Sequence, residues 1–312
     1  MSIKFTAPEN LSRLKLGDVI TFQGEAANEI IKVELIADGI YKLGEVPVFE
    51  GNWTLNYPFN RAGKRRITVN GFDSTNHKLT SDALDILLVG ETTNEIGIDV
   101  SNHNGNAIDW QTVKNSDVSF AFAKATEGIT YTDPYFNDNW KQMKAAGLIR
   151  GAYHFFRPLR NPEEQAQNLL KVIGDLEAED LPPVVDLEHY PDYIEEEWKQ
   201  INLNQRIERV QKWLDTVERA TGRKSLIYTS YGFWTTYMGN TEVFTKYPLW
   251  VANYTTKPQP LVPANNWGGN GWIFWQYTET GSVAGIRGNV DRNRFAGSFE
   301  KLLAFVNDSF IA

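Results

Sequence analysis

Two acidic residues, Asp186 and Glu188, interrupt an apolar run that reads Pro-Pro-Val-Val-Asp-Leu-Glu-His-Tyr at residues 182–190. The Pro-Pro start and the two valines predict a buried strand. Residues i and i+2 of a strand point to the same side, roughly 6.5–7 Å apart. Two carboxylates on one buried face are costly unless they have an ion-pair partner, a metal or an acid/base role. The pair is therefore the first candidate for catalysis.

Length and composition restrict the class of protein. A chain of 312 residues with 42% hydrophobic and 22% charged residues has the composition of a globular protein, and two domains are expected. The net charge of −8 argues against binding to nucleic acid. The absence of cysteine excludes disulfides, thiolate nucleophiles and Cys-ligated zinc. No apolar run is long enough to span a membrane, and no secretory signal is visible at the start.

Residues 1–90 have the pattern of a small all-β domain. Trp53, Leu55, Tyr57 and Phe59 alternate with polar residues and proline, which is the period of a half-buried strand. The predicted strands are 19–25, 30–37, 53–59, 65–71 and 83–89, with turn residues between them. We predict a β-sandwich that resembles the immunoglobulin-like modules attached to bacterial surface and wall-acting enzymes. No candidate catalytic cluster lies in it.

A polar stretch separates this region from one of different pattern, and we place a linker at residues 91–95. From 96 to 312, apolar strand-like runs alternate with amphipathic helical stretches, which predicts a parallel sheet. The predicted strands are 97–101, 118–125, 149–156, 182–188, 225–230, 249–254, 272–278 and a short run ending at Asp291; the predicted helices are 134–146, 162–177, 203–221 and 297–307. So many strands favour an irregular, TIM-like (β/α) barrel, whose active site lies at the carboxyl ends of the strands.

Polar and aromatic residues recur at those strand ends. They are Asp99, Glu127, Tyr153, Phe155, Asp186, Glu188, Tyr228, Trp250, Asn253, Trp275, Gln276 and Asp291. Each alone is compatible with a solvated loop, but most stand beside apolar core residues. A barrel would bring them together at one mouth.

Seven motifs in this region carry a family resemblance. In chain order they are Gly-Ile-Asp-Val-Ser, Phe-Ala-Phe-Ala-Lys-Ala-Thr-Glu-Gly, Gly-Ala-Tyr-His-Phe-Phe, Val-Val-Asp-Leu-Glu, Leu-Trp-Val-Ala-Asn-Tyr, Trp-Gln-Tyr-Thr and Gly-Asn-Val-Asp. From residue 96 to about 300 the chain resembles the lysozymes of glycoside hydrolase family 25, the Chalaropsis-type muramidases. The resemblance implies cleavage of the β-1,4 bond between N-acetylmuramic acid and N-acetylglucosamine in peptidoglycan, without any cofactor.

The resemblance and the chemistry of glycoside cleavage together assign roles to the acids. Glu188 matches the general acid, and a neighbouring charge from Asp186 with partial desolvation should raise its pKa. Asp186 either attacks the sugar directly or, as the resemblance favours, polarises the substrate's 2-acetamido group, with retention of configuration. Asp99 and Asp291 complete the acidic floor.

Further residues are expected to bind substrate. Lys124 matches a family position and is expected to pair with a carboxylate, although a lysine extending along the barrel wall is the alternative. The others are Glu127, Tyr153, Phe155, Tyr228, Trp250, Asn253, Trp275 and Gln276. For each aromatic ring, core packing is as plausible as sugar stacking. His154 should face away from Tyr153 and be packed, and no metal is expected because ligand spacing is missing.

Two competing functions stay open at this point. One is a chitinase-like N-acetylglucosaminidase, and the other is a non-catalytic cell-wall-binding protein. The peptidoglycan glycan strand is the expected partner, and residues 1–90 would target a wall component or dock on a phage-tail-like or injection assembly. The expected place of action is the cell wall, on its extracellular or periplasmic face. Without a visible signal, export would be by lysis, by packaging in a particle or through a trimmed signal.

Overall fold

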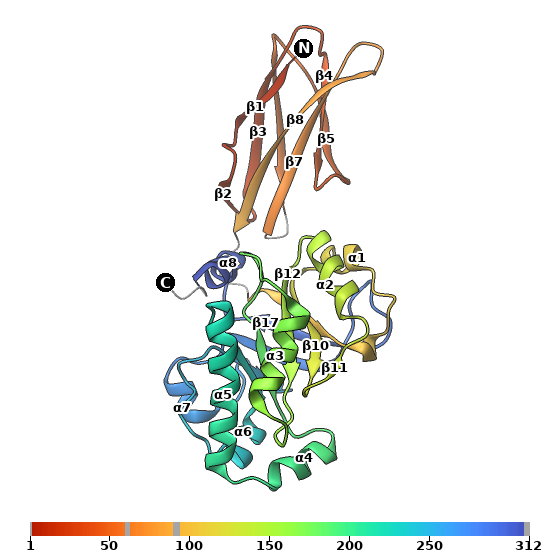
Figure 1. The fold of residues 1–312 in the computed structure, drawn as a ribbon. Coiled ribbons are helices and arrows are strands. Elements are labelled where there is room, and N and C mark those ends of the chain that lie inside the picture. The colour runs from red at the N-terminus through yellow and green to blue at the C-terminus, as the bar shows by residue number, and fades with distance from the viewer. Residues whose placement is uncertain (1, 60–62, 90–93, 309–312) are drawn as a thin grey trace. The chain divides into compact units, whose positions relative to one another are not determined.

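The computed structural model describes residues 2–59, 63–89 and 94–308, and its contacts divide the chain into two compact units, Met1–Thr93 and Asn94–Ala312 (Figure 1). The predicted linker at 91–95 falls mainly on residues 90–93, which lie outside the described residues. Neither unit contains a described helix that is long and apolar enough to cross a membrane.

The first unit consists of two sheets with a common core. One sheet has the order β1 (Ile3–Ala7), β3 (Val19–Ala26), β6 (Asn52–Pro58); the other has the order β2 (Ser12–Lys15), β8 (Lys78–Val89), β7 (Gly63–Phe72), β4 (Lys32–Ala37), β5 (Tyr41–Pro47). Phe22 and Trp53 of the first sheet share one apolar cluster with Val33 and Ile67 of the second. The alternation predicted for β6 is present, since Trp53 and Leu55 are buried between exposed neighbours.

Three strands of this unit were not predicted. β5 shows why, because its residues are exposed or only partly buried and carry no apolar alternation. β1 and β2 are also short, and β2 pairs with β8 in parallel, across more than 70 residues of sequence. Such long-range pairing leaves no local pattern to read.

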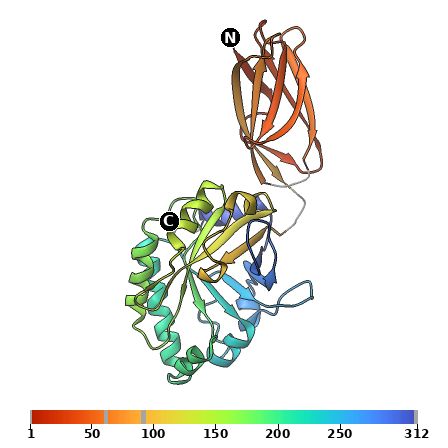
Figure 2. The same cartoon turned by 90° about the vertical axis from the view of Figure 1, so that its right-hand side faces the viewer.

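The second unit is built on a closed barrel, whose strands are drawn in Figure 2. Its eight strands, in order around the ring, are β9 (Ile96–Val100), β10 (Val118–Glu127), β12 (Ile149–Phe155), β13 (Val184–Leu187), β14 (Leu226–Ser230), β15 (Leu249–Ala252), β16 (Phe274–Gly281) and β17 (Val290–Phe295). β9 pairs with both β10 and β17, which closes the ring. β17 runs antiparallel to both of its neighbours, whereas the other strands pair in parallel. A short strand, β11 (Tyr131–Thr132), extends beside β10.

Helices lie outside the barrel (Figures 1 and 2). They are the 3-10 helix η1 (Asn102–Asn104) and the helices α1 (Trp110–Lys114), α2 (Phe136–Ala145), α3 (Pro162–Ile173), α4 (Asp192–Lys199), α5 (Leu203–Thr221), α6 (Tyr231–Tyr237), α7 (Pro263–Gly268) and α8 (Phe299–Asp308). The four predicted helices correspond to α2, α3, α5 and α8. In α5 the predicted apolar face is buried, and a capping box at Asn202 fixes the helix start.

Each barrel strand has one face toward the helices and one toward the barrel interior, and the register of the strand determines which face carries the acids. On β13, Val185 and Leu187 belong to the core shared with the helices. Because side chains alternate along a strand, Val184 and Asp186 face the barrel interior.

Aromatic rings fill part of that interior. Phe122 stacks on Trp250 with ring centres 4.3 Å apart and meets Phe274 edge-on at 5.2 Å. Gly151 leaves room for this packing, because a Cβ there would lie 2.3 Å from the Phe122 ring. The barrel is therefore a packed core rather than a pore, and the acids occupy only its carboxyl-terminal end.

Candidate active site

Four carboxylates meet at the carboxyl-terminal end of the barrel. Asp99 lies on β9, Asp186 on β13 and Asp291 on β17, and Glu188 directly follows β13. Asp99 and Asp291 are opposite each other in the β9–β17 register. Burial raises the pKa of the Tyr153 hydroxyl well above its usual value, and the charges of all four acids add to this. Tyr153 therefore stands among the acids that the sequence analysis grouped.

Asp99 and Asp291 form a proton-sharing pair. Burial raises the pKa of both acids, and the charge of Asp99 then helps to raise that of Asp291 to about 9. The Asp291 carboxyl therefore carries a proton at neutral pH and donates it in a hydrogen bond to Asp99. The Asp99 Oδ2 atom also accepts hydrogen bonds from the Gln276 Nε2 atom at 2.9 Å and the Asn293 Nδ2 atom at 2.7 Å. These donors hold Asp99 as the ionised member of the pair.

Asp186 and Glu188 both have raised pKa values. Burial raises the pKa of Glu188 to about 7, against an opposing effect of the Lys124 charge. Burial also raises the pKa of Asp186 well above its usual value, and here the charge of Glu188 is the next cause. Desolvation, one of the two predicted causes for Glu188, is the largest cause of its raised pKa. The predicted charge effect of Asp186 is not among the main causes, because Asp186 is the more deeply buried acid and holds its own proton.

One cation lies beside these acids. The Lys124 Nζ atom forms an ion pair with the Glu127 Oε2 atom at 2.8 Å and lies 4.8 Å from the centre of the Phe155 ring. The second carboxylate oxygen of Glu127 accepts from the Nη1 atom of Arg157 at 3.2 Å. Of the two readings of Lys124, the structure supports the one in which it pairs with a carboxylate.

Gln276 connects the Asp99 pair to two tyrosines. Its Oε1 atom accepts hydrogen bonds from the hydroxyls of Tyr228 at 2.9 Å and Tyr254 at 2.8 Å, while its amide donates to Asp99. Gln276 is buried and Tyr254 is half exposed. The network therefore runs from the buried acids to a ring that solvent reaches.

The structure buries three of the residues that were predicted to contact the substrate. Trp250 and Trp275 are 2% and 1% exposed, so neither ring has a free face for a sugar. Trp250 is sandwiched in the barrel interior and donates to the Asn293 Oδ1 atom at 2.8 Å, and Trp275 faces the helices. Phe155 is buried beneath Lys124. The Asn253 side chain accepts from the Leu261 backbone and so orders its own loop.

His154 is packed as predicted. It is fully buried, lies 2.7 Å from the Thr126 hydroxyl and stacks on Trp213, and burial lowers its pKa to about 3. Within the described ranges, no three His, Asp or Glu side chains are grouped so that they could hold a metal ion.

Sequence reasoning missed Asn293, Tyr254, Glu279 and Arg157. Asn293 is two residues from Asp291 on β17, so strand alternation was a signal that places both on one face. Tyr254 follows Asn253 directly in the Leu-Trp-Val-Ala-Asn-Tyr motif. Glu279 contributes negative charge that raises the pKa of Glu188 and Asp291, and nothing local to its sequence indicates this.

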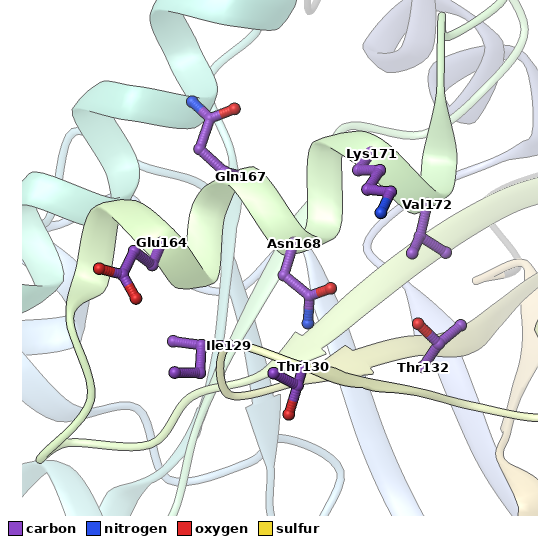
Figure 3. A pocket seen from close by; sticks show the side chains of 8 residues that line it. All are labelled: Ile129, Thr130, Thr132, Glu164, Gln167, Asn168, Lys171 and Val172. Atoms are coloured by element: carbon purple, nitrogen blue, oxygen red, sulfur yellow. The ribbon is translucent and has the colours of Figure 1, made fainter.

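A groove of about 530 Å³ lies elsewhere on this unit, between helix α3 and the segment that leads from β10 into β11 (Figure 3). Its lining residues are Ile129, Thr130, Thr132, Glu164, Gln167, Asn168, Lys171 and Val172. It contains none of the four clustered acids, and its polar side chains come mainly from the exposed face of α3. The groove is therefore distinct from the acid cluster.

Several acids at the carboxyl-terminal end of a barrel, among them Glu188 with a pKa of about 7, form the arrangement that glycosidases use. The family model of the glycosyl hydrolases family 25 matches residues 98–286, within the second unit. The chain belongs to this family.

Individual relatives agree with this assignment. Uncharacterized protein YegX of Escherichia coli (strain K12) is 40% identical over 216 residues, which are 68% of this chain and 73% of that protein. Lysozyme M1 of Streptomyces globisporus is 36% identical over 227 residues, 70% of this chain and 74% of that protein. The crystal structure of a bacterial lysozyme from Streptomyces coelicolor superposes with a TM-score of 0.65 at 37% identity, covering 70% of this chain and all of that one. The family resemblance of the sequence is thereby confirmed.

Proposed function

We propose that this chain is a lysozyme that cleaves the β-1,4 bond between N-acetylmuramic acid and N-acetylglucosamine in peptidoglycan. The observation that carries the proposal is Glu188, a carboxyl group with a pKa of about 7 among three further acids at a barrel mouth. Family membership and lysozyme relatives support the same substrate. The enzyme acts on the cell wall, and peptidoglycan glycan strands are its partner.

Glu188 is the proposed general acid. Glycoside cleavage needs a proton on the leaving oxygen as the bond breaks, and an acid with a pKa near the working pH delivers it best. Burial keeps Glu188 protonated up to about pH 7, and the Lys124 charge prevents its pKa from rising further. After the leaving sugar departs, the ionised Glu188 takes a proton from water as the base of the second step.

Asp186 is the proposed partner of the substrate's 2-acetamido group. Among the described residues its Oδ1 atom is buried and has no hydrogen-bond partner, so the acetamido N–H would supply the missing donor. Its raised pKa also makes it a poor nucleophile, because the attacking species would be the carboxylate. These two features favour attack by the acetamido oxygen over direct attack by Asp186. The expected outcome is retention of configuration.

The remaining site residues are proposed to bind and order the sugar. Asp99 and Asp291 form the acidic floor, and Tyr153, Tyr228 and Gln276 line it. Lys124 and Glu127 form its charged wall. We add Tyr254 to this set, because its half-exposed ring continues the Gln276 network to the surface.

The test is digestion of defined peptidoglycan by wild type and Glu188→Gln, with products identified by mass and the first-formed anomer read by NMR. We expect muramic acid at the new reducing end, the retained anomer, and a loss of about 10²- to 10⁴-fold in rate for the variant. Glu163→Gln, the same change at an exposed position of α3, is the control and should keep full activity. Near-normal activity of Glu188→Gln would show that Glu188 is not the general acid.

The proposal extends to the domain organisation. We propose a module at residues 1–90 with an immunoglobulin-like sandwich and a catalytic TIM-like, irregular barrel at 96–312, with 91–95 between them. Two sheets with one core, and a barrel whose last strand is antiparallel, support these descriptions. The first module would target the wall or dock on a larger assembly. A truncation that starts at residue 95 should retain cleavage of soluble glycan and lose binding to whole walls, and unchanged wall binding would contradict the targeting role.

A further inference from the structure

Arg157 stands between helix α4 and the charged wall of the active site. It follows β12, and its backbone is clamped to α3, since its N–H donates to the Gln165 Oε1 atom at 2.8 Å and its carbonyl accepts from the Gln165 Nε2 atom at 3.0 Å. On the α4 side its guanidinium donates to both carboxylate oxygens of Glu197, with the Nε contact at 3.2 Å, and lies 5.1 Å from the Tyr193 ring. Arg157 is therefore held on two sides, by its backbone at α3 and by its guanidinium at α4.

The third contact of Arg157 leads into the active site. Its Nη1 atom donates to Glu127 Oε1, while Lys124 takes Glu127 Oε2 at 2.8 Å. A single carboxylate thus bridges a fixed guanidinium and the ammonium that lies beside the catalytic acids. Each cation occupies one oxygen, so the orientation of Glu127 determines where Lys124 is held.

Burial distinguishes this chain of ion pairs from ordinary surface pairs. The exposed fractions of the side chains are 13% for Lys124, 19% for Glu127, 19% for Arg157 and 13% for Glu197. Solvent screens such groups less than exposed ones, so the geometry of the pairs matters more. The last member, Lys124, carries the charge that opposes the burial effect on Glu188.

We propose that Arg157 is a positioning residue for catalysis, which fixes Glu127 and through it holds the Lys124 ammonium beside Asp186 and Glu188. Without Arg157, Glu127 can rotate about its side-chain bonds and Lys124 can follow it away from the acids. The pKa of Glu188 then rises, because the charge that lowers it has retreated. The inference rests on the proposed role of Glu188 as general acid.

The test is the pH profile of kcat/KM on soluble glycan for wild type, Arg157→Ala, Lys124→Met and the double variant. Arg157→Ala and Lys124→Met should each raise the pKa at which kcat/KM falls on the basic limb of the profile, by about half a pH unit. The double variant should show the shift of Lys124→Met alone, because Arg157 acts through Lys124. Arg219→Ala removes the same charge from an exposed site on α5 and should leave the limb in place.

Three results would overturn the inference. Shifts that add in the double variant would mean that Arg157 acts by its own charge through space. An unshifted limb with a lowered unfolding midpoint would make Arg157 only a structural link to α4. An unshifted basic limb in Lys124→Met would show that Lys124 does not transmit the effect of Arg157 to Glu188.

A conservative variant keeps the test open if Arg157→Ala does not fold. Arg157→Lys retains the charge, but one ammonium cannot serve two carboxylates in the geometry of a guanidinium. It should show part of the upward shift, whereas a through-space charge effect predicts none. Failure of the proposed function is separate from these outcomes, because it would appear as activity retained in Glu188→Gln.

Discussion

Replacement of Glu188 by glutamine should stabilise the barrel at alkaline pH while it strongly lowers the rate of catalysis. The pKa of Glu188 is raised from 4.5 to about 7 by burial. Below about pH 4.5 both folded and unfolded chains hold the proton and the group has no cost. As the pH rises to about 7 the unfolded chain ionises and the folded one does not, so stability falls, by about 3 kcal/mol in total. Glutamine never ionises and avoids this loss.

Urea unfolding of wild type and Glu188→Gln at pH 4, 6 and 8 measures the effect. Of the 10 tryptophans only Trp53 lies outside residues 94–308, so tryptophan fluorescence reports mainly on the barrel. The variant should gain about 3 kcal/mol relative to wild type between pH 4 and pH 8, which corresponds to several degrees in Tm. Titrating groups that the Glu188 charge does not affect are common to both proteins and cancel in the difference. Asp186 does not cancel, because the Glu188 charge raises its pKa, and removal of that charge adds to the gain of the variant at alkaline pH.

A stability difference between the two proteins that does not change with pH is the contrary result. Such a result would show that burial of Glu188 does not raise its pKa in the folded chain. A difference that grows toward acid instead of alkaline pH would mean that the Lys124 charge outweighs burial. The expected result is a stability difference that grows between about pH 4.5 and pH 7 and stays constant above that range.

Three further predictions concern the same site. The kcat/KM of wild type should fall above about pH 7, because Glu188 must be protonated to act; a profile flat to pH 9 would contradict this. Asp291→Asn keeps a hydrogen-bond donor toward Asp99 and should change Tm little in thermal unfolding. Asp99→Leu leaves the buried amides of Gln276 and Asn293 without an acceptor, so the same measurement should show a loss of about 2 kcal/mol or more in the free energy of unfolding. Trp250→Ala should lose about 3–5 kcal/mol in urea unfolding, and a raised KM with unchanged stability would instead restore a sugar-stacking role.

Several features of the site were readable from local pattern. The i, i+2 spacing of Asp186 and Glu188 places both on one side of the chain, and the structure has Asp186 in the barrel interior with Glu188 just beyond the strand. Helix α5 was predicted because its apolar residues recur with a helical period within one continuous stretch. In both cases the deciding information is contained in a few consecutive residues.

Other features depended on contacts between distant residues. The β strands of a barrel are apolar on both faces, so alternation alone does not tell which tryptophan faces the interior and which faces the helices. Trp250 and Trp275 were both candidates for sugar stacking, with core packing equally plausible, and both are buried, one on each face. The short helix α4 was not predicted at all, yet it supplies the Glu197 that holds Arg157.

The sequence by itself determined the family and the acids at the ends of the predicted strands, because both are contained in short motifs. Only the tertiary structure decided which of those acids are protonated and which are ionised. Asp99 receives its hydrogen bonds from Gln276 and Asn293, which are 177 and 194 residues away, and burial raises the pKa of Glu188 to about 7. Protonation depends on burial and on nearby charges, and both arise only when the ring of strands closes.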